Sequence, residues 1–303
     1  MTHDDPMDAP PPSVLPQTRA IFLPLIMLLS MVVSRSIFEC GGAIAMMVVA
    51  VLGGASLETL ATDPMAVLRT DLMALLSMSM QLGMVFFLVA CWVLYGPDNE
   101  ERLFRRLPTT SLALLGLISG STVGFVSGWL HEQLSRLLPD LAQLAMQAQI
   151  VDALTSGPWL GRGMMLVAVI IVAPLFEEMA FRGVLWRGFE VAGRAIRPNS
   201  NTLGRRIALV ATTLLFALWH VDPIHVVALM PTAMLLGWLR YCSGSIWPAV
   251  LAHFVNNTMA ALIPMMMDMS EPTPTPIWLV SVGAIATTGL GTAAWVLRST
   301  EDT

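Results

Sequence analysis

Two adjacent glutamates and an arginine lie inside a long apolar stretch of this chain, in the segment PLFEEMAFR. Glu178 and Arg182 are four residues apart, so on a helix they share a face and can pair. Glu177 lies about 100° away around the same helix and cannot share that bond equally. A carboxylate left without a local partner in a low-dielectric environment can act as a general base. The alternative is a structural ion-pair cluster that orients the helix.

Two histidines flank a short polar segment between two short apolar runs. His220 follows the run 207–219, and Asp222 and His225 come directly after it. Because 13 residues of helix span only ~20 Å, neither run easily crosses a hydrocarbon core of ~30 Å. We therefore expect a hairpin whose tip stops inside the membrane, surrounded by protein or water. The alternative is a hairpin at the outer surface.

A third polar pair, His253 and Asn257, lies about two turns into the apolar run 245–266. These residues are also four apart and face one direction on a helix. Both side chains can donate hydrogen bonds to a developing oxyanion. The alternative is that they form interhelical hydrogen bonds, which are common for polar residues in membranes.

The three polar segments belong to a chain that is 55% hydrophobic and 12% charged, with a mean hydropathy of +0.71. Soluble domains carry about 25% charged residues. The composition therefore excludes a disordered chain and an ordinary soluble enzyme, and it predicts an all-α, polytopic integral membrane bundle. The net charge of −5 and the lack of a basic stripe argue against a nucleic-acid partner.

The apolar stretches predict about eight transmembrane helices, if the first stretch forms one long or kinked helix. They lie at residues 20–34 continuing into 37–54, 72–96, 109–130, 163–186, 207–219, 224–239, 245–266 and 276–297. Arg35 and Glu39 interrupt the first stretch at a spacing that lets them pair with each other. Splitting the stretch at this point would give nine helices.

The distribution of arginine predicts the orientation. All 16 basic residues are arginine. With eight helices and a cytoplasmic N-terminus, 12 arginines fall in cytoplasmic segments, three (Arg69, Arg136 and Arg162) fall outside, and Arg35 is buried. The positive-inside rule therefore favours cytoplasmic placement of both termini. We expect the protein in the inner (plasma) membrane of a bacterium.

In this order, the motifs EExxxR, FxxxH and HxxxN resemble the CAAX protease and bacteriocin-processing family of membrane proteins, also called the CPBP or ABI family. They are carried by Glu177, Glu178 and Arg182, by Phe216 and His220, and by His253 and Asn257. The resemblance covers residues 160–260, about a third of the chain. It implies an intramembrane glutamate endopeptidase of the CAAX prenyl endopeptidase type.

The resemblance also implies a role for each residue. Glu177 and His220 would hold and activate the attacking water, and His253 and Asn257 would bind the carbonyl oxygen as it becomes an oxyanion. The supporting residues would be Glu178 and Arg182 as a pair, and Phe216 packed beside the site. The partners would be membrane lipid and a peptide or membrane-protein substrate, and no cofactor would be needed.

We accordingly expect four parts along the chain. They are a disordered tail (1–19), N-terminal transmembrane helices with interfacial segments (20–157), the catalytic core (158–266), and a last transmembrane helix with the C-terminal tail (267–303). Leucines in 131–157 predict a helix on the outer membrane surface. Glycines at four-residue steps from Gly116 to Gly128 predict close helix packing.

Three alternatives remain open at this point. Glu177, His220 and His253 are a possible three-ligand zinc site in a metal-dependent variant of the same protease. The chain could instead be a non-catalytic immunity or scaffold protein that keeps these residues for packing. It could also be a transporter in which Glu177 and His220 couple protons, although no inverted repeat is evident.

Overall fold

The structure is a computed structural model. It describes residues 17–54, 70–95, 108–142, 159–198, 200–266 and 277–301, with the single positions 56, 58, 150, 154 and 155. Helices make up almost all of these residues, and no strand occurs among them. The predicted all-α class is therefore confirmed. Residues 1–16 of the expected tail lie outside the described part of the chain.

Each predicted apolar stretch corresponds to one continuous helical segment, with ends that in most cases differ by a few residues. These segments are α1 (Gln17–Leu52), α3 (Thr70–Tyr95), α5 (Thr110–Leu137), the run from α8 to α10 (Trp159–Ile196), α11 (Asn201–Leu218), α12 (Pro223–Ser243), α13 (Trp247–Met266) and α14 (Ile277–Glu301). Within the described residues, five segments are long and apolar enough to cross a membrane: α1, α3, α5, α8 to α10, and α12. The first stretch is one unbroken helix of 36 residues, so it does not split into two.

Two of these differences bear on other parts of the prediction. Helix α5 continues through Leu137, and the short helix α6 (Pro139–Ala142) follows; the predicted surface helix therefore cannot begin at residue 131. An ion pair between Glu132 and Arg136 on successive turns favours this continuation. The rest of that segment lies mostly outside the described residues. Helix α1 begins at Gln17, three residues before the predicted stretch.

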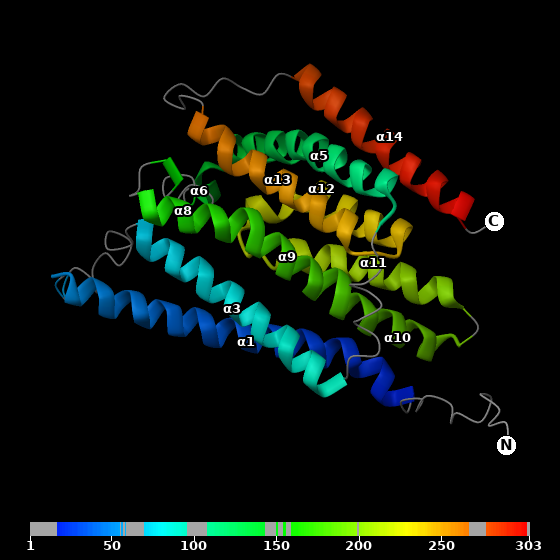
Figure 1. Ribbon diagram of the computed structural model, residues 1–303, viewed down its shortest axis with the longest axis horizontal. Coiled ribbons are helices and arrows are strands. Elements are labelled where there is room, and N and C mark those ends of the chain that lie inside the picture. The colour runs from blue at the N-terminus through cyan, green and yellow to red at the C-terminus, as the bar shows by residue number, and fades with distance from the viewer. Residues whose placement is uncertain are drawn as a thin grey trace, which may run out of the picture.

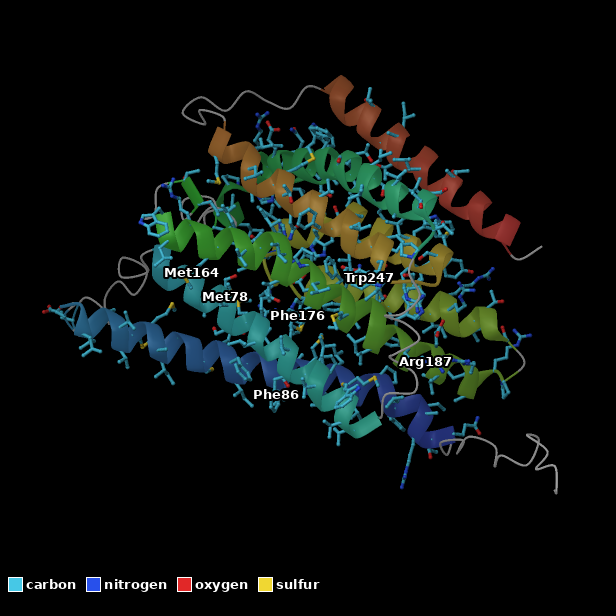
Figure 2. The ribbon with its side chains drawn as sticks, viewed as in Figure 1. Met78, Phe86, Met164, Phe176, Arg187 and Trp247 are labelled. Atoms are coloured by element: carbon cyan, nitrogen blue, oxygen red, sulfur yellow. The ribbon has the colours of Figure 1, made fainter. Side chains whose placement is uncertain are left out.

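The long helices lie side by side in one bundle (Figure 1). Helices α1 and α3 pack together at one edge, α14 packs on α5 at the other edge, and α11, α12 and α13 lie between them. The start of α1 and the end of α14 lie at the same end of the bundle (Figure 1). Arg187 lies toward that same end (Figure 2). The first and the last described helix therefore have their outer ends on the same side of the bundle.

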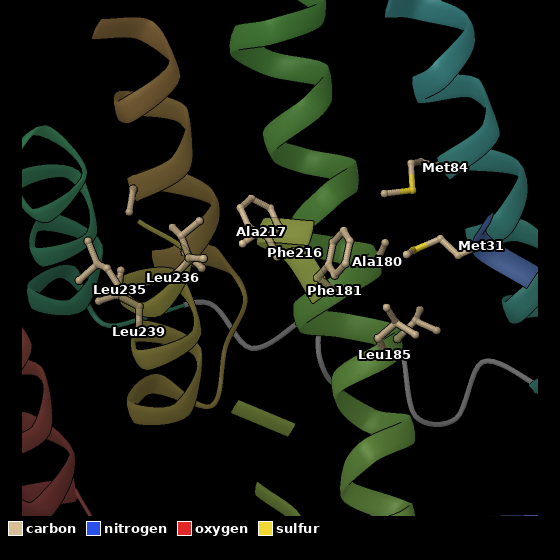
Figure 3. Packing of buried hydrophobic residues seen from close by; sticks show 14 of the residues in the cluster. Met31, Met84, Ala180, Phe181, Leu185, Phe216, Ala217, Leu235, Leu236 and Leu239 are labelled. Carbon is tan, nitrogen blue, oxygen red and sulfur yellow. The ribbon is translucent and has the colours of Figure 1, made fainter. Parts of the chain in front are cut away.

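The core of the bundle lies where α1, α3, α11 and α12 meet the segment that carries the two glutamates. The rings of Phe181 and Phe216 pack edge to face with centroids 5.4 Å apart. Met31 and Met84 point toward the helix that carries Phe181 (Figure 3). Such edge-to-face packing stabilises by about 0.5–1.5 kcal/mol beyond the area that it buries. The core therefore fixes the helix of Glu177 against α11.

The hairpin between α11 and α12 ends at mid-depth in the bundle. Arg35, which is near the middle of α1, donates from Nη1 to the carbonyl oxygen of Trp219 over 2.8 Å. Asp222 then caps α12, because its Oδ1 accepts from the backbone N–H groups of residues 224 and 225. Between them, Val221 has a φ of +62°, which is strained for a β-branched residue. The hairpin tip thus lies beside the middle of α1, and its depth in the membrane stays a prediction.

Two glycines of the predicted ladder allow α5 to approach α13 closely. A Cβ atom at Gly116 would lie 3.2 Å from backbone carbon atoms of Pro248, and one at Gly120 would lie 2.8 Å from those of Ala252. A Cβ atom at Gly128 would meet nothing within 4 Å. Close helix packing is therefore confirmed for the first half of the ladder.

We expect Gly120→Ala to lower the stability of the bundle, because the new methyl group would push α5 away from α13. The destabilisation should be roughly 1–3 kcal/mol. Thermal unfolding of the purified protein in detergent measures it. Gly128→Ala is the matched control, and it should change stability by less than about 1 kcal/mol. Equal melting temperatures for the two variants would contradict this packing.

Candidate active site

The helix that carries both glutamates is distorted on either side of them. Two π-helical segments, η2 (Ala168–Val172) and η3 (Met179–Leu185), flank the short helix α9 (Ala173–Glu178). In η2, the N–H of Ala173 bonds to the carbonyl of Ala168, five residues back. The next donor in this register would be Pro174, which has no N–H group. The carbonyl of Val169 therefore loses its helical partner.

Asn257 supplies the missing donor from α13. Its Nδ2 donates to the carbonyl oxygen of Val169 over 2.9 Å, and its Oδ1 accepts from Nδ2 of Asn256 over 3.2 Å. One hydrogen of Nδ2 remains for another acceptor. Asn257 thus contacts the bend that precedes the glutamates, and its described hydrogen bonds do not reach Glu177.

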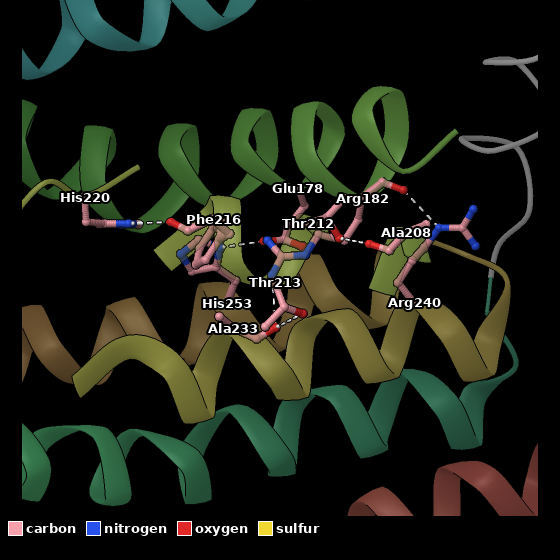
Figure 4. A network of polar contacts seen from close by, with 10 residues as sticks. All are labelled: Glu178, Arg182, Ala208, Thr212, Thr213, Phe216, His220, Ala233, Arg240 and His253. Atoms are coloured by element: carbon pink, nitrogen blue, oxygen red, sulfur yellow. Dashed lines mark hydrogen bonds and ion pairs between the residues drawn. The ribbon is translucent and has the colours of Figure 1, made fainter. Parts of the chain in front are cut away.

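Glu178 is the central residue of a buried polar network (Figure 4). Its Oε1 accepts from Nη1 of Arg182 and lies at the same distance, 3.1 Å, from Nδ1 of His253. Arg182 also donates from Nη2 to the carbonyl oxygen of Ala233 on α12. The predicted Glu178–Arg182 pair is therefore present, and the sequence spacing did not show that His253 joins it.

The network fixes the proton of His253. A carboxylate only accepts hydrogen bonds, so Nδ1 of His253 must carry a hydrogen to bond with Glu178. In the neutral ring, Nε2 is then the nitrogen with the free lone pair. The structure therefore orients this imidazole through Glu178, in the way that a buried carboxylate orients the histidine of a catalytic triad.

His220 is held in a similar way by a backbone carbonyl. Its Nδ1 lies 3.0 Å from the carbonyl oxygen of Phe216, which can only accept, so Nε2 is again the free nitrogen in the neutral ring. The Phe216 ring is completely buried and lies 5.2 Å from the ring of His220 and 5.5 Å from that of His253. Phe216 therefore contacts both imidazoles.

Glu177 is 7% exposed and lies next to this arrangement. Its carboxyl group interacts electrostatically with His253 and Arg35, and the side chain of Gln81 can form a hydrogen bond with it. His220 in turn interacts electrostatically with His253 and Arg35. Glu177, His220 and His253 thus lie in the same region of the bundle, with Arg35 near them.

Two members of this arrangement come from helices in the N-terminal half. Arg35 on α1 was expected to pair with Glu39, and it does so over 3.3 Å; its contact with Trp219, whose ring lies 4.4 Å from the guanidinium, was not expected. Gln81 on α3 was missed altogether. A single glutamine in an apolar run is a signal of its own, because polar groups inside membranes need partners.

Beyond His220, two more histidines form a chain of rings. The His225 ring lies 5.1 Å from that of His220, and the His131 ring on α5 lies 6.1 Å from that of His225. Sequence reasoning singled out His225 but not His131, which lies in another helix. Neither ring takes part in the contacts that surround Glu177.

Two of the histidines share one feature with metal ligands. Histidines that donate one ring nitrogen to a carboxylate or carbonyl, as His220 and His253 do, resemble metal ligands in this respect. However, no three His, Cys, Asp or Glu side chains in the described part of the chain form a group that could hold a metal ion. This includes the alternative zinc set of Glu177, His220 and His253.

The comparisons with known proteins agree with the motifs. Residues 159–259 match the family described as type II CAAX prenyl endopeptidase, Rce1-like. No curated protein and no solved structure matches the chain. The matched segment holds all three motifs and covers about a third of the sequence. Residues 159–259 are therefore similar to the Rce1-like family of type II CAAX prenyl endopeptidases, and the rest of the chain is not covered by this match.

Proposed function

We propose that the protein is an intramembrane endopeptidase that cleaves a membrane-associated or lipidated peptide with a water activated by Glu177 and His220. The observation that supports this proposal is that Glu177, His220 and His253, from three distant parts of the chain, lie near enough to interact electrostatically. The match to the Rce1-like family supports CAAX-type protease activity in general. Ionisable groups inside a membrane are energetically costly, so those that occur there usually mark a functional site.

In the proposed reaction, the water donates one hydrogen to the Glu177 carboxylate and the other to Nε2 of His220. The water oxygen then attacks the peptide carbonyl carbon as Glu177 takes the first proton. Glu177 next gives this proton to the leaving amine, the C–N bond breaks, and the carboxyl product remains. Because the proton returns to the products, Glu177 is ready for the next cycle.

The oxyanion formed in this step would be bound from α13. The unused Nδ2 hydrogen of Asn257 is one donor. His253 becomes a second donor when its Nε2 also carries a proton, and the Glu178 carboxylate can balance the charge of that imidazolium. Glu178 and Arg182 are supporting residues in this scheme, and no cofactor takes part.

We also propose that both termini face the cytoplasm of a bacterial cell. The start of α1, the end of α14 and the arginines of α10 and α11 lie at one end of the bundle. An excess of arginine on the cytoplasmic side is typical of membrane proteins.

Glu177→Gln and His220→Ala should each lower kcat/KM for a prenylated CAAX peptide in proteoliposomes by about 10²–10⁴-fold, because each removes a proton acceptor from the water. Mass spectrometry of the cleaved peptide measures the rate. Glu190→Gln is the control, since Glu190 pairs with Arg187 and Arg194 on α10, and it should cleave normally. Normal cleavage by both site variants would refute the mechanism.

Asn257→Ala should lower kcat by about 10²–10³-fold with little change in KM, because an oxyanion donor acts mainly in the transition state. It should also destabilise the protein by about 1–3 kcal/mol, since the Val169 carbonyl loses its donor. The neighbouring Asn256→Ala is the matched control and should keep most activity. A lower melting temperature with unchanged kcat would assign Asn257 a structural role only.

Cleavage should persist after treatment with EDTA or 1,10-phenanthroline, because the proposed proton acceptors are side chains of the protein. The rate of cleavage of the same peptide, without and with the chelator, measures the metal dependence. Loss of activity that added zinc restores would instead support the zinc set of Glu177, His220 and His253.

A further inference from the structure

Gln81 occupies an unusual position outside the segment that matches the family. It lies near the middle of α3, which packs against α9, η2 and η3. Its side chain is buried, with 8% of the residue exposed. Helix α3 therefore brings a polar side chain from the N-terminal half directly to the proposed base.

The chemistry of the amide determines its orientation. The Gln81 side chain lies beside the Glu177 carboxyl group, with which it can form a hydrogen bond. A carboxylate can only accept, so the Nε2 group of Gln81 donates. Oε1 is buried and has no hydrogen-bond partner among the described residues. An unused acceptor thus lies beside the carboxylate that would activate the water.

A buried carbonyl oxygen without a partner is rare in proteins, and each case calls for an explanation. The proposed substrate offers one. A peptide that enters the interior of a membrane protein brings main-chain N–H groups, and each of these needs an acceptor when water is excluded. In the reaction described above, both hydrogens of the attacking water already have acceptors, so Oε1 remains available for the peptide.

We propose that Oε1 of Gln81 accepts a hydrogen bond from a main-chain N–H of the substrate next to the scissile bond. Gln81 would then bind the peptide and the base at once, through the two ends of one amide group. This inference rests on the proposed function, because it requires the peptide to lie beside Glu177. It makes α3 part of the substrate site.

The test uses prenylated CAAX peptides in which each amide neighbouring the scissile bond is replaced in turn by an ester, which lacks the N–H. In the unaltered protein, one replacement should lower kcat/KM by roughly 5–150-fold, because Oε1 is left unpaired. In Gln81→Met, the amide and ester peptides should be cleaved at equal rates. The ratio of the two rates isolates the contact, since loss of the Glu177 hydrogen bond slows both peptides alike.

Met84→Ala is the matched control, because Met84 is buried on the same helix. It removes packing without a polar group, so it should keep the full preference for the amide peptide. Gln81→Asn keeps the amide on a shorter side chain and should lose the preference.

A preference for the amide that survives in Gln81→Met, or its absence at every position in the unaltered protein, would overturn the inference. Normal cleavage by Glu177→Gln would instead overturn the proposed function. The two failures are therefore distinguishable in one series of measurements.

Discussion

The buried Glu178 carboxylate is the interaction on which the site depends. One of its oxygens serves Arg182 and His253 at the same time, and no solvent reaches the group. In a low-dielectric interior, removing one partner of such a network leaves an uncompensated charge, which is strongly destabilising. Arg182 extends the network to α12 through Ala233, and Arg240 donates to the backbone of Arg182. The orientation of His253 is therefore fixed by the same contacts that hold three helices together.

The sequence predicted those parts of the structure that depend on local spacing. The apolar stretches located the helices, and four-residue spacing paired Glu178 with Arg182. Contacts between distant helices were not visible in this way. The bond from Glu178 to His253, the use of Asn257 on a distorted helix, and the approach of Gln81 all depend on how the helices pack. Spacing along a chain indicates which face a residue occupies but not which helix covers that face.

The helix distortions around the glutamates have an identifiable cause. Pro174 removes one backbone donor three residues before Glu177, and the chain compensates with a wider turn and with Asn257. π-helical turns of this kind are frequent at functional sites. The proline thereby links the EExxxR motif to the HxxxN motif through a main-chain carbonyl. The two motifs are thus coupled in structure as well as in chemistry.

The absence of lysine from the sequence has a consequence for the interior of the bundle. A buried lysine readily gives up its proton, whereas a guanidinium keeps its charge in almost any protein environment. The side chains of Arg35 and Arg182 therefore stay positively charged inside the bundle. Among the ionisable groups next to Glu177, carboxyl and imidazole groups are the ones that can change their ionisation, so these side chains can respond to the acidity of the surroundings.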